Sequence, residues 1–329
     1  MKKLSLLIFT ILFGFNLVFS QGYIKDSSIF NIAPEFSGTR GEVAEKASLT
    51  NYVPLVIPQT GATCVAHAFA MARSIMYARE NKFTDPSKIT AYQMSPYFLY
   101  YLTRDKNDYG CETGLSPAKI INTIKNYGFA HMFDVEYPGF FPFTDTVLCP
   151  NSMDYYPPVL NNHLSYSKNY AVEEVYVTST VEGIKAALNL DYPVVLGIDV
   201  APSFEDLQGK LWIPAKNEKK TDFENSGHAV VVVAYDDSYM GGAVQIVNSW
   251  GPSWGDNGMA WIRYSDLQKW MDIGIVMELK SASDKKVATT KSKTYKKMTP
   301  KQIQISVNNK KTKIDNQNYI NSFEKGLND

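Results

Sequence analysis

The chain has 329 residues, and removing a leader of about twenty residues would leave a mature chain that suits one large domain or two fused halves. Hydrophobic residues at 45%, aromatic residues at 13% and charged residues at 20% exclude a disordered protein, a collagen-like repeat and a polytopic membrane protein. The 33 basic residues balance the 33 acidic residues, so net charge alone favours neither nucleic acid nor an acidic membrane as a partner.

Residues 1–20 have the pattern of a secretory signal peptide. Lys2 and Lys3 precede an apolar run that carries no further charge and ends in Val18 and Ser20. A membrane anchor is the alternative, but it needs about twenty apolar residues, and this run is slightly shorter. Cleavage near Ser20 would release a secreted, periplasmic or cell-surface protein with no stable membrane insertion.

The three cysteines are an odd number for a secreted protein, so at least one thiol has no partner within the chain. An oxidising compartment favours a disulfide between Cys111 and Cys149, although both could be free. With that pairing, Cys64 remains the reduced thiol.

The first half of the mature chain is expected to be mainly helical. Residues 64–80 contain no Gly or Pro, and their apolar residues recur at spacings of four, three and four, with Thr63 as a candidate N-cap. Further helices are expected over residues 94–103 and over residues 116–127, where Ser116 is the cap and Gly128 the stop.

The second half is expected to be mainly a sheet, with one helix over residues 181–190. Apolar runs predict strands over residues 172–177, 193–200, 229–235, 243–248, 259–264 and 273–279. Helices followed by antiparallel strands indicate an α+β chain of two lobes, and ligand sites commonly lie between lobes.

Residues 280–329 differ in composition from the rest of the chain. They hold twelve Lys, no Arg and four acidic residues, a net charge of +8, whereas residues 21–279 carry −10. The segment has neither the interleaved aromatics of a nucleic-acid binder nor a basic amphipathic helix, and it cannot form a core alone. We expect a flexible Lys-rich extension and no nucleic-acid partner.

Cys64 stands where a thiol is easiest to ionise, because the free N–H groups and dipole at a helix start stabilise a thiolate. A nucleophile needs a base, and His228 opens a strand run that precedes the run ending in Asn248. A hairpin between these runs would let the Asn248 amide oxygen accept from one imidazole nitrogen, while the other nitrogen faces Cys64. Cys, His and Asn in this order indicate an acyl-transfer triad.

Four segments resemble the papain-like cysteine peptidases. The family's motif from glutamine to cysteine is similar to PQTGATCVAHAFA, its histidine strand to SGHAVVVVAY, and its Asn-Ser-Trp-Gly stretch to IVNSWGPSWGDNGMAWI. The family's substrate-cleft loop is similar to YGCETG, residues 109–114. The matches follow the family's order between residues 51 and 279, so the chain is identified as a member on this resemblance. It implies the two-lobed papain-like fold over residues 21–279, a helical N-terminal lobe and an antiparallel sheet or barrel in the C-terminal lobe, with the cleft between them.

The resemblance implies roles for individual residues. Cys64 would be the nucleophile, His228 the general acid and base, Asn248 the residue that orients His228, and Gln59 a donor to the oxyanion together with the Cys64 N–H.

At the substrate site, Trp250 would shield the histidine–asparagine bond from water, and Gly114 would offer backbone hydrogen bonds to an extended peptide. A peptide or protein is the expected substrate, and we expect a monomer that needs no metal and no organic cofactor.

Three departures from the family pattern stand out. Only four residues separate Gln59 from Cys64 where the family usually has five, which shortens the loop. Val65 replaces the tryptophan that usually follows the nucleophile. The family's cysteine that bridges to the Cys111 position is absent, since Gly61 or Ala62 occupies that place.

The other histidines are assigned to structure. His67 lies three residues after Cys64, but two further ligands for a metal are missing, so a core or supporting histidine is expected. His131 and His163 stand in loop-like contexts and are expected at the solvated surface.

The implied function is a secreted thiol peptidase that hydrolyses peptide bonds through a thioester. An inactive papain-like binding protein and an acyltransferase with the same triad are the alternatives. The sequence leaves open the preferred side chain and the choice between endopeptidase and exopeptidase. It also leaves open what restrains activity, because the 43 residues between the leader and Cys64 are too few for the family's inhibitory domain.

Overall fold

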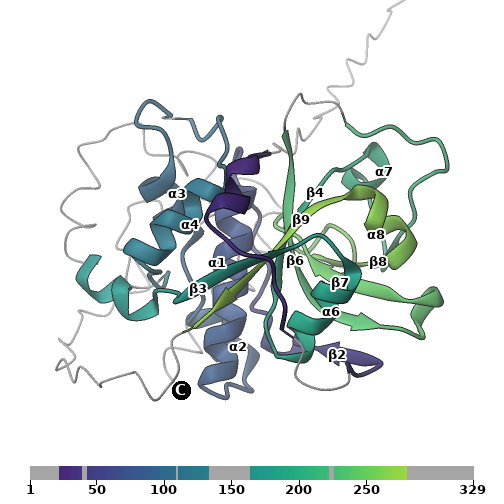
Figure 1. Cartoon of the computed structure of the whole chain (residues 1–329), viewed down its shortest axis with the longest axis horizontal. Coiled ribbons are helices and arrows are strands. Elements are labelled where there is room, and N and C mark those ends of the chain that lie inside the picture. Colours follow the sequence, from purple (N-terminus) through teal and green to yellow (C-terminus); the bar gives the residue numbers. More distant parts are fainter. Residues whose placement is uncertain (1–21, 39–42, 109, 133–163, 222–225, 280–329) are drawn as a thin grey trace, which may run out of the picture.

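The computed structural model describes residues 22–38, 43–108, 110–132, 164–221 and 226–279. The expected leader, the Lys-rich extension, Cys149 and His163 lie outside these ranges, so the expectations for them stay predictions. Within the described ranges the chain forms a helical lobe and a lobe built on a sheet, the expected α+β papain-like architecture (Figure 1). None of the helices in these ranges is long and apolar enough to cross a membrane.

The helical lobe is built around one long buried helix, α1 (Cys64–Glu80). Around it lie α2 (Pro86–Ala91), α3 (Pro96–Thr103) and α4 (Pro117–Asn126). Each of these three begins with a proline that follows a residue whose side chain accepts a backbone N–H, and these capping residues are Asp85, Ser95 and Ser116. The helix expected over residues 94–103 therefore begins two residues later, after its cap.

Thr63 is the N-cap residue of α1, as the sequence predicts. Its side chain makes no capping hydrogen bond to the helix, because its hydroxyl donates to the Thr60 carbonyl oxygen at 2.8 Å instead. The hydroxyl thus closes the turn that leads into the helix.

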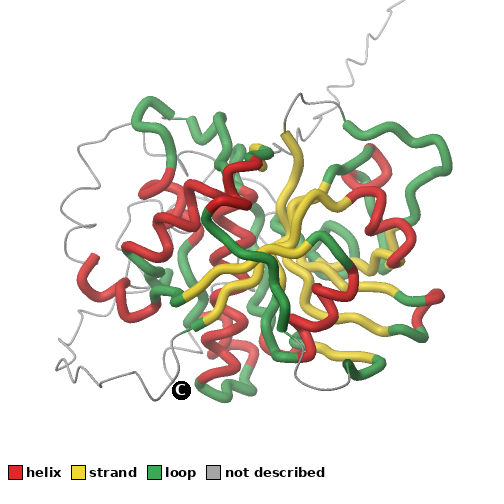
Figure 2. Tube along the Cα trace, in the orientation of Figure 1, coloured by secondary structure: helices red, strands yellow, loops and turns green. Residues whose placement is uncertain are grey.

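The second lobe carries a sheet of order β3-β9-β4-β6-β7-β8-β5, drawn in yellow in Figure 2. Its strands are β3 (Glu174–Thr178), β4 (Val194–Ile198), β5 (Leu211–Trp212), β6 (Ser226–Asp236), β7 (Ala243–Val247), β8 (Met259–Arg263) and β9 (Met271–Glu278). Neighbours are antiparallel except β5 and β8. The helices of this lobe are α6 (Val181–Asn189), α7 (Pro202–Glu205) and α8 (Tyr264–Trp270).

Strand β6 pairs with four other strands. Besides β4 and β7, it pairs with two short N-terminal strands, β1 (Tyr23–Ile24) and β2 (Lys46–Ser48). The six strands expected from apolar runs are present within a few residues. Elements with no counterpart in the sequence analysis are β1, β2, β5, α2, α7 and α8.

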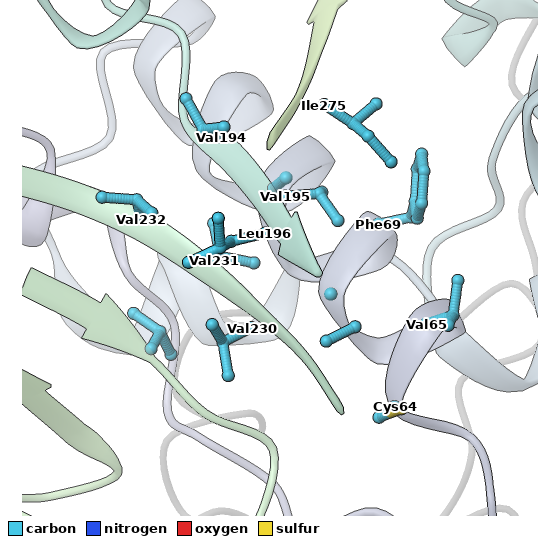
Figure 3. Close-up of a cluster of buried hydrophobic side chains, with 14 of the residues drawn as sticks. Cys64, Val65, Phe69, Val194, Val195, Leu196, Val230, Val231, Val232 and Ile275 are labelled. Atoms are coloured by element: carbon cyan, nitrogen blue, oxygen red, sulfur yellow. The ribbon is translucent and has the colours of Figure 1, made fainter. Parts of the chain in front are cut away.

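The core lies between α1 and the sheet. Phe69 on α1 packs in one buried cluster with Val195, Val231 and Ile275 from three strands (Figure 3). Helix α1 packs on β6 and β4, and its first residue, Cys64, lies near the beginning of β6, where the Ala229 backbone N–H acts on the thiol. This packing brings Cys64 and His228 to the same place.

Candidate active site

Cys64 is the first residue of α1, and its side chain is completely buried. Its Sγ accepts a hydrogen bond from the backbone N–H of Gly22 at 3.3 Å. Burial raises the pKa of Cys64 to about 11, although the backbone N–H groups of Gly22, Ala229 and Val65 act in the opposite direction. The expectation of an easily ionised thiol is wrong for this state of the molecule, because the cost of burying a thiolate exceeds what the helix start returns.

His228 and Asn248 lie side by side at corresponding ends of β6 and β7. The imidazole Nε2 is 2.7 Å from the Asn248 Oδ1, which also accepts the Ser249 N–H at 2.7 Å. Burial lowers the pKa of His228 to about 4, and the Asn248 hydrogen bond opposes this shift, so the ring is neutral at pH 7. The remaining nitrogen, Nδ1, has no hydrogen-bond partner among the described residues. It is the atom available to take a proton.

Trp250 covers the His228 ring. The two ring centroids are 4.5 Å apart with 31° between the planes, and Trp250 is 4% exposed. Phe204 and Trp254 pack edge-on against Trp250, with centroids at 5.6 and 5.9 Å. The indole therefore lies where it excludes water from the histidine–asparagine pair.

Gln59 is held at both ends of its side-chain amide. Its Oε1 accepts the Ser249 hydroxyl at 2.6 Å, and its Nε2 donates to the Gly61 carbonyl oxygen at 2.8 Å. Ser249, which sequence reasoning did not single out, thus joins Gln59 to the residue after Asn248. Because the amide binds its own turn here, its role as an oxyanion donor stays a prediction.

A short N-terminal segment, residues 22–26, lies across the site, and we call it the strap. Leu115 donates its N–H to the Gly22 carbonyl oxygen at 2.8 Å and accepts from the Ile24 N–H at 3.1 Å. On the other side, Tyr23 and Ile24 pair with Gly227 and Ser226 of β6. The strap is therefore an extra strand that joins the two lobes above Cys64.

Gly114 permits this close approach. It has a φ of +71°, and a Cβ on it would lie 2.4 Å from the Gly22 carbonyl oxygen. The residue that is expected to contact an extended peptide thus lies against the strap.

The direction of the strap explains why it places no carbonyl carbon where the Cys64 sulfur could attack it. It pairs in parallel with Leu115 and antiparallel with β6, and it turns the Gly22 N–H toward the Cys64 Sγ. A chain running the opposite way along the same path exchanges its N–H and C=O groups, so it would turn a carbonyl toward the sulfur. A substrate is therefore expected to run opposite to the strap.

Side chains anchor the strap to both lobes. Lys25 Nζ lies 2.6 Å from Asp199 Oδ1 on the sheet side. On the helical side the Ser116 hydroxyl donates to Asp26 Oδ2 at 2.5 Å, and hydrogen bonds from Ser116 and Ser28 hold the pKa of Asp26 below its usual range.

The two other histidines within the described residues, His67 and His131, are structural. His67 is buried, its Nδ1 lies 3.1 Å from the Thr63 carbonyl oxygen, and burial lowers its pKa to about 4. His131 is 1% exposed, with Nδ1 2.7 Å from the Tyr92 carbonyl oxygen, so the predicted surface position is wrong. Tyr77 and Tyr170 enclose its ring. Among the described residues, no group of three or more His, Cys, Asp or Glu side chains could hold a metal ion.

The cysteines differ in state. Cys64 is a free thiol and Cys111 is disulfide-bonded. Cys149 lies outside the described residues, so its pairing with Cys111 stays a prediction. Where the family has a bridge to the loop before the nucleophile, the Ala62 N–H donates to the Cys111 carbonyl oxygen at 2.6 Å.

Comparisons with known proteins agree with this geometry. Residues 72–281 match the family described as "Papain family cysteine protease". A curated relative, the uncharacterized peptidase C1-like protein L477 of Acanthamoeba polyphaga mimivirus, is 27% identical over 198 residues, which are 60% of this chain and 58% of that protein. This chain thus spans less than two thirds of its relative's length.

Solved structures share the fold. Xylellain, a cysteine protease from Xylella fastidiosa, superposes with a TM-score of 0.61 at 21% identity, over 79% of this chain and 96% of that one. Procathepsin B S9 from Trypanosoma congolense gives a TM-score of 0.58 at 17% identity, over 79% and 87%. Digestive procathepsin L 3 from Tenebrio molitor gives 0.57 at 16%, over 79% and 77%.

The family match covers well over half of the chain and includes His228 and Asn248, whereas Gln59 and Cys64 precede it. With a family match of this extent and the same fold in solved relatives, the chain belongs to the papain family of cysteine proteases.

Proposed function

We propose that the protein is a peptidase that hydrolyses peptide bonds with Cys64, His228 and Asn248. The observation that carries this proposal is the 2.7 Å hydrogen bond between His228 Nε2 and Asn248 Oδ1. It lies beneath Trp250 and beside the start of α1. With Nε2 occupied by Asn248, the free Nδ1 of His228 is directed to proton transfer.

In the proposed reaction, the Cys64 proton moves to His228 Nδ1 and the sulfur attacks the scissile carbonyl carbon, forming a C–S bond. The Cys64 N–H and the Gln59 amide stabilise the oxyanion. His228 then returns the proton to the amine as the C–N bond breaks, leaving a thioester. Water gives a proton to His228 and its oxygen displaces the sulfur, which releases the acid and restores the thiol.

The strap makes the described state latent. It buries the Cys64 thiol, satisfies its sulfur with the Gly22 N–H, and leaves His228 Nδ1 without a bond. Substrate can reach the thiol only when residues 22–24 leave the path between Leu115 and β6. The strap thereby supplies a restraint on activity, a question that the sequence analysis left open.

Removal of the leader during export would leave the strap in place. We propose that the leader is removed near Ser20, so that the mature chain begins just before Gly22 and keeps the strap. Only the sequence pattern of residues 1–20 supports this step. The N-terminal sequence of the protein recovered outside the producing cell tests it, and an unprocessed N-terminus would contradict it.

The test of the peptidase function uses the full chain, a Tyr23→Ala variant with a weakened strap, and the same variant carrying Cys64→Ala. Each is incubated with a peptide library under reducing conditions, and the products are identified by mass spectrometry. Cleavage by Tyr23→Ala that Cys64→Ala abolishes is the expected result. Cleavage that persists without Cys64 would contradict the mechanism.

The same experiment separates the alternatives. Peptide capture without any cleavage, by a chain whose Cys64 reacts with iodoacetamide, would indicate a binding protein. Products joined to an added amine would indicate an acyltransferase.

A further inference from the structure

His67 is a buried histidine of α1 that stands three residues after Cys64 and has no part in the proposed reaction. It is 5% exposed, and the Tyr97 ring packs edge-on against it, with centroids 5.5 Å apart. Its Nδ1 is 3.1 Å from the Thr63 carbonyl oxygen, which can only accept, so Nδ1 carries the hydrogen. Burial lowers the pKa of His67 to about 4, so the ring is neutral at pH 7 and its Nε2 is an acceptor.

Two buried polar atoms beside the site have no hydrogen-bond partner among the described residues, His67 Nε2 and Asn248 Nδ2. The Asn248 Oδ1 accepts the Ser249 N–H and lies 2.7 Å from His228 Nε2, which fixes the amide with its oxygen toward the imidazole. The Nδ2 of the same amide therefore keeps its donors for another partner. A buried acceptor and a buried donor are each costly while unpaired.

One cavity borders both of these side chains. It lies between α1, β6 and the end of β7, and the space open to the centre of a water molecule is about 20 Å³. This volume is enough for one water. Gln93 adds a third polar side chain to the lining, and most of the other lining residues are apolar. A water in this cavity would therefore find its polar partners in a few side chains, two of which are His67 and Asn248.

We propose that a water molecule in this cavity accepts a hydrogen bond from Asn248 Nδ2 and donates one to His67 Nε2, which makes His67 a positioning residue for the His228–Asn248 pair. The water pairs the donor with the acceptor. It holds the amide by its nitrogen, while His228 and Ser249 hold the oxygen, so the amide that orients the imidazole is restrained at both ends. The kinetic effect of His67 rests on the proposed peptidase function, whereas the water site does not.

A crystal structure of the unaltered full chain, at a resolution that shows ordered water, tests the site directly. We expect one water within about 2.7 to 3.2 Å of both His67 Nε2 and Asn248 Nδ2. The structure of His67→Phe should lack this water, because the phenyl ring offers no acceptor and takes up part of the cavity. A structure of the unaltered chain in which no water bonds both atoms would overturn the inference.

The kinetic test uses the Tyr23→Ala chain, in which the strap is weakened. Adding His67→Phe should lower kcat/KM for peptide hydrolysis by about three- to tenfold, mainly through kcat, because the amide donor is left unpaired and the imidazole is less firmly oriented. His67→Gln keeps an acceptor near the position of Nε2, so it should retain most of the activity. An equal loss in both variants would show that the acceptor has no effect, which contradicts the positioning role.

A double-mutant cycle separates an effect through Asn248 from a general loss of stability. In the chain that also carries Asn248→Ala, His67→Phe should change kcat/KM by less than about twofold, since the amide that the water holds is absent. Fully multiplicative effects of the two substitutions would overturn the positioning role.

His131 supplies a matched control. It is 1% exposed and its Nδ1 is 2.7 Å from the Tyr92 carbonyl oxygen, but it packs beside Tyr77, toward the other end of α1. His131→Phe should lower the melting temperature about as much as His67→Phe and leave kcat/KM unchanged. Equal kinetic losses in these two variants would indicate a general loosening of the helical lobe and overturn the positioning role. A bridging water in a chain that cleaves no peptide would support the water site and overturn the peptidase function.

Discussion

The two sides of the cleft differ in how they are organised. On the sheet side, His228 and Asn248 are bonded at 2.7 Å and Trp250 covers them. On the helical side, Cys64 binds the Gly22 N–H and the Gln59 amide binds the Gly61 carbonyl oxygen. His228, the proposed base, is thus already oriented in this state, whereas Cys64, the proposed nucleophile, contacts groups that a substrate would have to replace.

The difference follows from what holds each side. The histidine–asparagine pair belongs to a buried strand ladder, so it persists as long as the sheet is folded. The strap is five residues long and depends on a few hydrogen bonds and one ion pair, so it can detach at a smaller cost. If the proposed function holds, control of activity would therefore act on the side of Cys64, where the strap lies.

The largest expected effect comes from removing His228, the proposed base on the sheet side of the site. In the strap-weakened Tyr23→Ala chain, His228→Ala should reduce kcat/KM for peptide hydrolysis by about a thousandfold, because proton transfer to and from Nδ1 is lost. Hydrolysis by this variant at the rate of its parent would point to another base, with His67 the first candidate.

The second-largest effect concerns the pH dependence of Cys64 alkylation, on the side where the strap covers the thiol. Burial gives Cys64 a pKa of about 11, so below that pH the thiolate fraction rises about tenfold for each pH unit. Alkylation of Cys64 in the unaltered chain should increase about a hundredfold from pH 7 to pH 9 without a plateau. Tyr23→Ala should react faster at pH 7 and rise less steeply, since its thiol regains solvent and His228. A plateau below pH 9 in the unaltered chain would show that the strap does not keep the thiol neutral.

A smaller effect is expected at Asn248, which orients the base without carrying the proton. Asn248→Ala should lower kcat/KM by about ten- to a hundredfold, as is common for groups that orient a histidine. Circular dichroism and melting control for folding. A loss as complete as that of Cys64→Ala in a folded variant would mean that Asn248 takes part in the chemistry directly.

The same contrast separates what the sequence predicts from what it does not. The run that becomes β6 is long and rich in valine, and the short apolar run that becomes β7 follows it closely, so their pairing, and with it the contact of His228 and Asn248, is expected from pattern alone. The strap forms a strand of two residues whose partners are Leu115 and Gly227. A segment this short has no periodicity, and no local pattern encodes partners so distant in the chain.

Two errors in the sequence analysis have this same cause. The pKa of Cys64 depends on the strap that buries it, and this contact outweighs the helix start that the sequence reveals. His131 stands in a loop-like context, but Tyr77, Tyr92 and Tyr170 from distant segments enclose it. In both cases the prediction was wrong because residues distant in the chain bury the side chain.

The smallest expected effect tests one anchor of the strap. Lys25→Ala removes the ion pair with Asp199, in which the lysine is 35% exposed, so its contribution is reduced by solvent. We expect Cys64 in this variant to be alkylated about two- to fivefold faster at pH 7.5, with the gain largest at low salt. Lys125→Ala is the matched control, because it removes a pair with Glu174 that lies outside the strap and in which the lysine is 30% exposed. An equal gain in both variants would mean that lost positive charge alone raises reactivity, whereas a gain confined to Lys25→Ala would identify the Asp199 contact as part of the restraint on Cys64.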